Sequence, residues 1–167
     1  MKLDLREIIE IPGSSIPFEC ELETESLVFP QIREYRVPPI ARGIVKNIAG
    51  ALIAEGEIEA EMLQVCDRCL EEFEAKTIIP ISVPLTNVPE DAESADLFLF
   101  FGDELELLEL VESVFLFEMD AKSLCCEDCL GLCPDCGVNL NREECACDEK
   151  IDPRLAVLGQ LLDTKDE

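Results

Sequence analysis

The chain has 167 residues and a formal net charge of −25, with 48% hydrophobic and 5% aromatic residues. This length allows one ordinary domain with a small additional module, and the aliphatic content is high enough for a packed core, which excludes a disordered tail. No apolar run approaches the length of a membrane span, so we expect no membrane protein. The first residues lack the apolar core of a signal peptide, and we predict a cytoplasmic protein.

The negative charge is concentrated in the middle of the chain. Residues 1–53 have a net charge of −2, residues 54–128 of −18 and residues 129–167 of −5. A region this acidic repels phosphate backbones, so we expect no direct wrapping of nucleic acid and favour a basic protein as the partner. The alternative is that the acids only keep the protein soluble.

Alternation of apolar and polar residues predicts β-strands in the first half of the chain. Residues 3–9 fit a short strand or one turn of helix, and residues 16–22 fit a strand with one solvated face. Cys20 falls on the apolar side of that strand, where we expect a buried, inert thiol. Residues 41–65 are expected to form one long meander whose turns, bulges or bends fall at its glycines, Gly43, Gly50 and Gly56.

The clearest strand is predicted over residues 57–62, where acids occupy every second position. One face of this strand must be core, and the other must present the carboxylates of Glu57, Glu59 and Glu61. We interpret this row of acids, together with Arg68, as the candidate partner-binding surface. A plain solvated strand face is the alternative for the acids, and a plain surface residue or an ion pair with Glu71 or Glu72 is the alternative for the arginine.

Two further strands and a loop are predicted next. Residues 77–85 contain two prolines, which suit an edge strand. The polar residues 86–96 are expected to form a mobile loop, and residues 97–101 one more apolar strand.

A helix is predicted near residues 103–118, because the apolar period changes there to that of an α-helix. Asp103 and Glu106 have the spacing of a helix start. The buried face of this connecting helix is expected to carry Leu105, Leu108, Val111 and Phe115. Near the end of the chain, Asp152 as N-cap and Pro153 as first helical residue predict a short amphipathic helix.

The cysteines indicate a metal centre. The chain contains ten cysteines and no histidine, so a metal ion would have to be bound by sulfur, with or without a carboxylate. In a reducing compartment such a segment indicates metal binding or redox activity before disulfides. Cys133-Pro134-Asp135-Cys136-Gly137 has the form of a zinc knuckle. It predicts a four-thiolate site made of Cys133, Cys136, Cys145 and Cys147.

A second four-thiolate site is possible across the domain. It would combine the upstream pair with Cys129 and with one of two adjacent cysteines, so its candidates are Cys66, Cys69, Cys125, Cys126 and Cys129. Because sequence does not reveal connectivity, other partitions of the same cysteines stay open.

We expect one or two structural zinc ions rather than an iron–sulfur cluster, because closed sets of four cysteines are common in structural zinc sites. With sulfur in every position there is no open coordination position for a catalytic water. We therefore predict no catalytic residues, no small-molecule substrate and no enzyme. A thiol redox protein is an alternative, since Cys66 and Cys69 have thioredoxin-type spacing, but we expect the surrounding acids to raise the thiol pKa and lower reactivity.

The motifs, taken in order, resemble the YceD family of bacteria and plastids. The resemblance is carried by residues 65–71, by residues 129–137, by Asn139-Leu140-Asn141, by Cys145-Ala146-Cys147 and by Asp152-Pro153-Arg154, with Leu155 in place of an expected aromatic residue. Some members of the family keep the upstream cysteine pair but lack most of the downstream cysteines. The resemblance implies a factor in maturation or stability of the large ribosomal subunit, linked to accumulation of its RNA. Genes of the family often lie beside that of a small, basic ribosomal protein.

We therefore predict an α+β protein with an antiparallel β-sheet domain over residues 1–120 and a cysteine-rich zinc module over residues 121–167. The predicted function is a non-enzymatic factor for large ribosomal subunit biogenesis that binds a basic ribosomal protein or a large-subunit precursor. The first alternative is a zinc-stabilised interaction or regulatory module without a ribosomal role.

Overall fold

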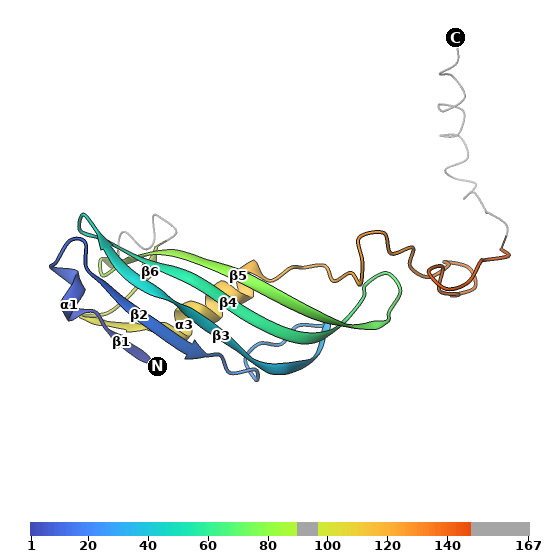
Figure 1. Ribbon diagram of the computed structural model, residues 1–167, viewed down its shortest axis with the longest axis horizontal. Helices are drawn as coiled ribbons and strands as arrows, with labels where there is room; N and C mark the ends of the chain where they lie inside the picture. The colour runs from blue at the N-terminus through green and yellow to red at the C-terminus, as the bar shows by residue number, and fades with distance from the viewer. Residues whose placement is uncertain (90–96, 148–167) are drawn as a thin grey trace, which may run out of the picture.

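A five-stranded sheet forms the body of the molecule, which the computed structural model describes over residues 1–89 and 97–147 (Figure 1). The strand order is β2-β3-β4-β5-β6, and neighbouring strands are antiparallel except for β5 and β6. The predicted α+β class with an antiparallel sheet agrees with this architecture. The strands are β2 Ser15–Glu21, β3 Ile32–Ile48, β4 Ala51–Val65, β5 Glu72–Thr86 and β6 Phe98–Leu99.

The N-terminal segment pairs with a strand far along the chain. β1 (Lys2–Asp4) is antiparallel to β7 (Glu104–Glu106), and α1 (Arg6–Ile9) follows β1 directly. Both predicted alternatives, a strand and one turn of helix, therefore occur in succession. The strand β7 leads into α3 (Leu107–Glu118), which lies across the sheet (Figure 1).

The β3–β4 hairpin turns at Ala49 and Gly50, which have φ angles of 53° and 98°. Two consecutive left-handed residues form a type I′ turn, whose twist matches that of the flanking strands. Buried Asn47 fixes this turn, because its Oδ1 accepts a hydrogen bond of 2.8 Å from the backbone N–H of Gly50. The Nδ2 of Asn47 donates to the carbonyl oxygens of Ile8 and Ile9 at 2.7 and 2.9 Å, which ties α1 to the hairpin.

Gly50 is a turn residue as predicted, but no turn or bulge occurs at Gly43 or Gly56. These two glycines face each other in the β3–β4 register. A Cβ atom on Gly43 would lie 2.2 Å from the carbonyl oxygen of Glu55 and 2.7 Å from the ring of Phe18. Glycine is needed at both positions because neighbouring groups approach the backbone closely. Close approach is, besides bulges and bends, a common reason for glycine in a strand.

The strand prediction missed the first half of β3. This strand begins at Ile32, and its pairing with β4 shifts register three times before Ile40. Pro38 and Pro39 lie in the irregular part, where missing N–H groups interrupt the ladder. The period-two pattern is therefore broken in the sequence although the chain stays extended.

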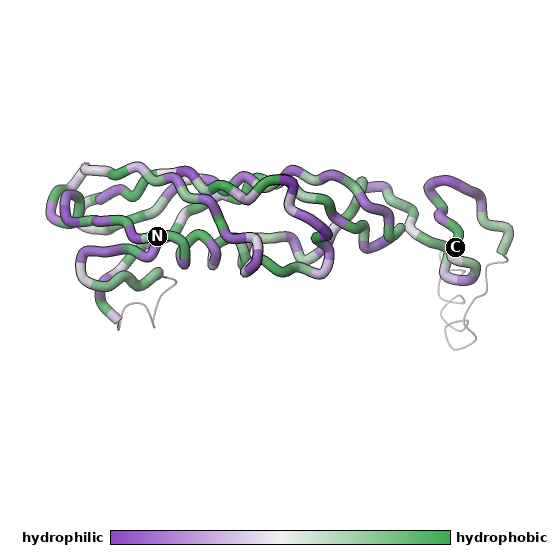
Figure 2. The backbone as a smooth tube through the Cα atoms, turned by 90° about the horizontal axis from the view of Figure 1, so that it is seen from below, coloured by the Kyte–Doolittle hydropathy of each residue, from purple (hydrophilic) through white to green (hydrophobic). Residues whose placement is uncertain are grey.

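The core lies between one face of the sheet and α3. Along β4, Ile58, Ala60 and Met62 are buried and the acids between them face outward, as predicted. Figure 2 shows this alternation of hydrophobic and hydrophilic residues along the strands. Cys20 is buried in the same core, which confirms the predicted buried thiol, and burial raises its pKa.

The helix begins later than predicted. Residues 104–106 form β7, so Leu105 belongs to a strand, and Glu106 as N-cap makes no side-chain hydrogen bond. The predicted helix start with Asp103 and Glu106 is therefore wrong. Leu108 lies half-buried beside the buried face, which consists of Leu107, Leu110, Val111, Val114 and Phe115.

The helix is a core element as well as a connection to the cysteines. The ring of Phe115 is 5.8 Å from that of Phe29 in an edge-on arrangement and 6.4 Å from that of Tyr35. This aromatic group fixes α3 on the residues that precede and begin β3.

The predicted edge strand is β5. In the part of the chain that the structure describes, its side away from β4 pairs with β6 only at Leu85 and Thr86. Pro80 is therefore tolerated, because no neighbouring strand needs its N–H. Most of the predicted loop 86–96 and the whole predicted helix after Asp152 lie outside the described residues. Within residues 1–89 and 97–147, no helix is long and apolar enough to cross a membrane.

Candidate metal centre

Cys66 and Cys69 lie in the loop that joins β4 to β5, at the tip of this hairpin (Figure 1). The β4–β5 ladder ends at the pair Val65 and Glu72, so residues 66–71 form the loop. The backbone N–H of Cys66 donates to the carbonyl of Glu71, and that of Leu70 donates to the carbonyl of Cys66, both at 2.9 Å. This short, tightly bonded loop holds the two cysteines together.

Cys133 and Cys136 lie in a loop with the same pair of hydrogen bonds. The N–H of Cys133 donates to the carbonyl of Val138 at 2.8 Å, and that of Gly137 donates to the carbonyl of Cys133 at 2.9 Å. The residue after the second cysteine is left-handed in both loops, with φ angles of 60° at Leu70 and 75° at Gly137. The structure therefore contains two equivalent knuckles, of which only the downstream one has glycine at this position.

The upstream knuckle and the segment after α3 form a spanning cluster, made of Cys66, Cys69, Cys125 and Cys129. All four Sγ atoms lie within 4.8 Å of one another. The Sγ atoms of Cys66 and Cys129 are 3.8 Å apart, and those of Cys69 and Cys125 are 3.7 Å apart. The Sγ of Cys126 is 3.9 Å from that of Cys125, but Cys126 is exposed and is outside the group of four. The structure thus brings Cys125 into the cluster and leaves its neighbour out.

The second group of four, the downstream cluster, consists of Cys133, Cys136, Cys145 and Cys147, and its Sγ atoms also lie within 4.8 Å of one another. The Sγ of Cys145 is 3.6 Å from that of Cys136 and 3.2 Å from that of Cys133. These are the four residues that the sequence grouped together, and they come from a single stretch of chain.

Both clusters fit a tetrahedral metal ion. Metal–sulfur bonds of about 2.3 Å require sulfur atoms about 3.8 Å apart, whereas a disulfide requires about 2.05 Å. The measured separations of 3.2 to 3.8 Å lie near the first value, and all ten cysteines are free thiols. Each cluster could therefore hold one divalent ion on four thiolates, and the ion would tie its chain segments together.

Backbone N–H groups favour thiolates in both knuckles. Burial disfavours the Cys66 thiolate, but N–H groups of Cys125, Cys69 and Arg68 that donate to its sulfur lower the pKa of Cys66 to about 6. This differs from the raised pKa that the acidic surroundings led us to expect, because the nearest dipoles point at the sulfur. The pKa of Cys133 is lowered to about 6, mainly by a hydrogen bond from the backbone N–H of Cys136 and to a smaller extent by one from the thiol of Cys145.

Asn141 contacts a cysteine of the spanning cluster and was missed as a site residue. Its Nδ2 lies 3.4 Å from the Sγ of Cys129, and its Oδ1 accepts a hydrogen bond of 2.8 Å from the N–H of Leu130. The same Nδ2 donates to Asn139 Oδ1 at 2.8 Å. A donor aimed at a ligand sulfur supports the first coordination sphere. The Asn-Leu-Asn motif was a sequence signal for this role, but nothing in its spacing tied it to Cys129.

Polar contacts join the segment after α3 to the hairpin tip. The N–H of Asp67 donates to the carbonyl of Ser123 at 2.8 Å, and the N–H of Ser123 donates to Asp67 Oδ2 at 2.7 Å. The Ser123 hydroxyl donates to buried Gln64 Oε1 at 2.7 Å. These bonds place Cys125 beside Cys69 independently of any ion.

Arg68 does not pair with Glu71 or Glu72. Its Nη1 donates to the carbonyl oxygens of Glu127 and Cys129 at 3.2 and 2.9 Å, so this side chain holds the cysteine loop. Glu71 pairs instead with Arg142 at 2.7 Å, and Glu72 lies 3.9 Å from Arg33. The ion pair that the sequence offered as an alternative for Arg68 is therefore not formed, because the guanidinium binds carbonyl oxygens of the cysteine loop instead.

The acids of β4 face solvent, but cations from the neighbouring strands lie among them. Lys76 on β5 is 3.2 Å from Glu61 and 3.9 Å from Glu59, and Arg42 on β3 is the register partner of Glu57. The row of acids is therefore partly neutralised. Its role as a partner-binding surface remains a prediction.

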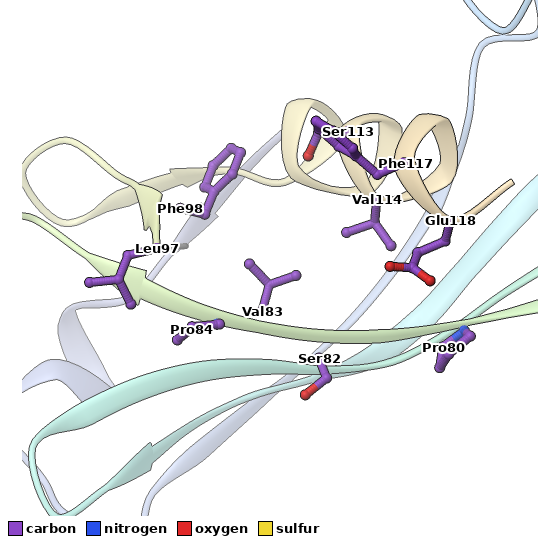
Figure 3. A pocket seen from close by; sticks show the side chains of 10 residues that line it. All are labelled: Pro80, Ser82, Val83, Pro84, Leu97, Phe98, Ser113, Val114, Phe117 and Glu118. Atoms are coloured by element: carbon purple, nitrogen blue, oxygen red, sulfur yellow. The ribbon is translucent and has the colours of Figure 1, made fainter. Parts of the chain in front are cut away.

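An open groove of about 530 Å³ lies between α3 and β5. Figure 3 shows Val114 pointing from α3 toward Val83 on β5, with Phe98 at one end and Glu118 near the other. Glu118 is the one ionisable side chain among the described residues that line the groove. This lining offers apolar contacts rather than a pair of acid and base groups.

Comparison with known protein families assigns the chain to one of them. Residues 54–162, from near the start of β4 to beyond the downstream cluster, match the family described as large ribosomal RNA subunit accumulation protein YceD. The chain belongs to the YceD family. The resemblance drawn from the cysteine motifs is thereby confirmed, and the matched region includes both clusters of this YceD family member.

Relatives of this YceD chain include uncharacterized proteins of Mycobacterium bovis and of two strains of Mycobacterium tuberculosis. Each is 26% identical over 122 residues, which is 71% of this chain. The chain spans 59% of the length of these curated relatives. No solved structure matches it.

Proposed function

We propose that this chain is a non-enzymatic factor that supports large ribosomal subunit biogenesis and accumulation of its RNA. Membership of the YceD family, whose description refers to this RNA, is the observation that carries the proposal. The apolar lining of the groove between α3 and β5 supports a binding protein rather than a catalyst. We propose that the protein carries out this function in the cytoplasm.

The partner in this proposal is a basic ribosomal protein, alone or on a large-subunit precursor. Residues 54–128 carry a net charge of −18, which attracts lysine-rich and arginine-rich proteins and repels bare RNA. The first candidates for the contact surface are exposed Glu57 and Glu61, half-buried Glu59 between them, and the loop around Arg68.

The two clusters each hold a structural zinc ion in this proposal. Four sulfur ligands per ion leave no position for a water, which suits a structural role, and zinc commonly takes such closed sets. The ions would fix the segment 121–147, which has few buried apolar residues of its own, onto the β4–β5 tip.

Depletion and co-purification test the proposed function. Loss of the protein should lower the ratio of large-subunit to small-subunit RNA, and the tagged full chain should recover a basic ribosomal protein at moderate salt. Recovery of ribosomal RNA without any ribosomal protein would contradict the proposed mode of binding. An unchanged RNA ratio would favour the alternative, a zinc-stabilised interaction module without a ribosomal role.

A thiol redox protein is the remaining alternative, and the low pKa of Cys66 is the observation that favours it. Cys66 is fully buried and Cys69 is 3% exposed, so a disulfide substrate has little access to either sulfur. Titration of the metal-loaded protein with a thiol reagent separates the two roles. Slow reaction of the cluster thiols is expected for a structural site, and rapid reaction of Cys66 would favour redox chemistry.

A further inference from the structure

The two equivalent knuckles differ at one position in a way that metal binding does not explain. Leu70 and Gly137 both follow the second cysteine of their knuckle and both have positive φ. A residue with a Cβ atom adopts this conformation at an energetic cost that glycine does not have. The upstream knuckle therefore carries a bulky side chain where the fold alone would favour glycine.

The folded chain gains little from this side chain. Leu70 is 63% exposed, so its burial does not compensate for the backbone strain. Leu130, on the adjacent loop, is 66% exposed. Two large apolar side chains thus project into solvent beside the spanning cluster.

The two leucines lie on chain segments that contact each other. Gly131 packs against Arg68 so closely that a Cβ atom on Gly131 would lie 3.0 Å from the Arg68 carbonyl oxygen. The same oxygen accepts a hydrogen bond of 3.1 Å from the N–H of Leu132. Leu130 and Leu70 are therefore held on the two chain segments that meet at Arg68. We call these two side chains the leucine surface.

The surroundings of the leucine surface are acidic. Residues 66–72 and 121–147 contain eight acids and three bases. Two of those bases are engaged within the protein, since Arg68 donates to backbone carbonyls and Arg142 pairs with Glu71 at 2.7 Å. A divalent ion on four thiolates leaves each cluster with a charge of about −2, which adds to the negative field.

We propose that the leucine surface is the docking site for a lysine- and arginine-rich protein segment that carries apolar anchor residues. Exposed apolar groups ringed by charge of one sign fit a partner with apolar anchors and the opposite charge. The inference rests on the proposed function for the basic character of the partner. It goes further because it names the residues that bind and predicts that charge alone is insufficient.

Two synthetic peptides of equal length and charge test this inference on the zinc-loaded full chain. One alternates lysine with leucine and the other alternates lysine with serine. The lysine–leucine peptide should bind at least tenfold more tightly at moderate salt, because one buried apolar anchor contributes about one order of magnitude. Equal affinity of the two peptides would overturn the proposal.

Variants then locate the binding surface. Leu70→Gly and Leu130→Ser should each weaken the lysine–leucine complex about tenfold. Ile11→Ser is the matched control, since Ile11 is 58% exposed and follows α1, outside both the leucine surface and the row of acids on β4. It should leave affinity unchanged. Leu70→Gly should also keep or raise the melting temperature, because glycine relieves the left-handed strain, so its loss of affinity cannot be attributed to misfolding.

The remaining outcomes separate this inference from the proposed function. If the wild-type chain and Leu70→Gly recover the same ribosomal protein equally well, the leucine surface is wrong and the function stands. If the leucines bind the peptide but the wild-type chain recovers no ribosomal protein, the function is wrong and the surface stands. A dimer in analytical ultracentrifugation that Leu70→Gly abolishes would overturn the proposal in favour of a second copy of this chain.

Discussion

At the scale of single residues, Cys126 and Cys129 separate ligands from bystanders. Cys129 is buried with its Sγ 3.8 Å from that of Cys66, whereas Cys126 is exposed and outside both groups of four. Cys129→Ser should therefore remove one metal ion per chain, because serine is a poor ligand for zinc beside three thiolates. Metal content measured by inductively coupled plasma mass spectrometry checks this.

The adjacent cysteine supplies the control. Cys126→Ser should keep the metal content of the wild-type chain. A loss of metal in Cys126→Ser with retention in a Cys125→Ser variant would show that the spanning cluster uses the other of the two neighbours.

Asn141 makes a second prediction at this scale. Its Nδ2 lies 3.4 Å from Cys129 Sγ, so Asn141→Ala should weaken metal binding at the spanning cluster by about 10- to 100-fold, the usual effect of losing a supporting hydrogen bond. Competition with a chelator measures the affinity. The downstream cluster in the same molecule is the control, and equal weakening of both ions would mean that Asn141 acts on the fold instead.

At the scale of elements, the close pairing of β3 with β4 depends on Gly43. A Cβ there would lie 2.2 Å from a backbone oxygen, and backbone cannot move as a flexible side chain can. Gly43→Ala should lower the free energy of unfolding by about 1 to 3 kcal/mol, the usual range for overpacking. Denaturant titration measures the change.

A surface glycine provides the comparison for Gly43. Gly102 differs from Gly43 in having a positive φ, of 62°, and a Cβ at Gly102 would meet nothing within 4 Å. Gly102→Asn should be tolerated, since asparagine adopts left-handed conformations more readily than other residues. Similar losses of stability in both variants would show that close approach at Gly43 is not the cause.

Local sequence patterns were sufficient to predict some elements and site residues but not others. The alternation of Glu57 to Met62 predicted β4, and the spacing of Cys133 and Cys136 predicted a knuckle, because both patterns depend on neighbours within a few residues. The choice between Cys125 and Cys126 depends on contacts between Ser123 and Asp67 across 56 residues, which no local pattern contains. The same reason applies to Leu105, which pairs with Leu3 as a strand although its spacing suits a helix.

The hydrogen-bond and ion-pair partners of the charged residues could not be predicted from the sequence either. Arg68 stands three residues from Glu71, yet it bonds to Cys129 carbonyl oxygen, and Glu71 bonds to Arg142. In the folded molecule the β4–β5 tip packs against the cysteine loops. Arg68 and Glu71 therefore bond to residues that are distant in the sequence. A charge pattern therefore predicts the sign of a surface better than it predicts its pairs.

At the scale of the whole molecule, the sheet and the cysteine-rich segment should respond differently to metal removal. The sheet and α3 share a core of buried apolar residues, whereas the buried residues beside the spanning cluster are mainly its own cysteines. A chelator should therefore expose the amides of residues 121–147 to hydrogen exchange and leave those of β3 and β4 protected. Loss of protection throughout the sheet would show that the ions stabilise the entire fold.

We expect the chain to hold two separate four-thiolate metal sites, one of which joins the β4–β5 tip to the segment after α3. The most direct measurement is the mass of the purified full chain under native and denaturing conditions. The two masses should differ by two zinc ions, with all ten cysteines reduced in the denatured protein. A native mass without metal, or a denatured mass that reveals disulfides among the cluster cysteines, would contradict it.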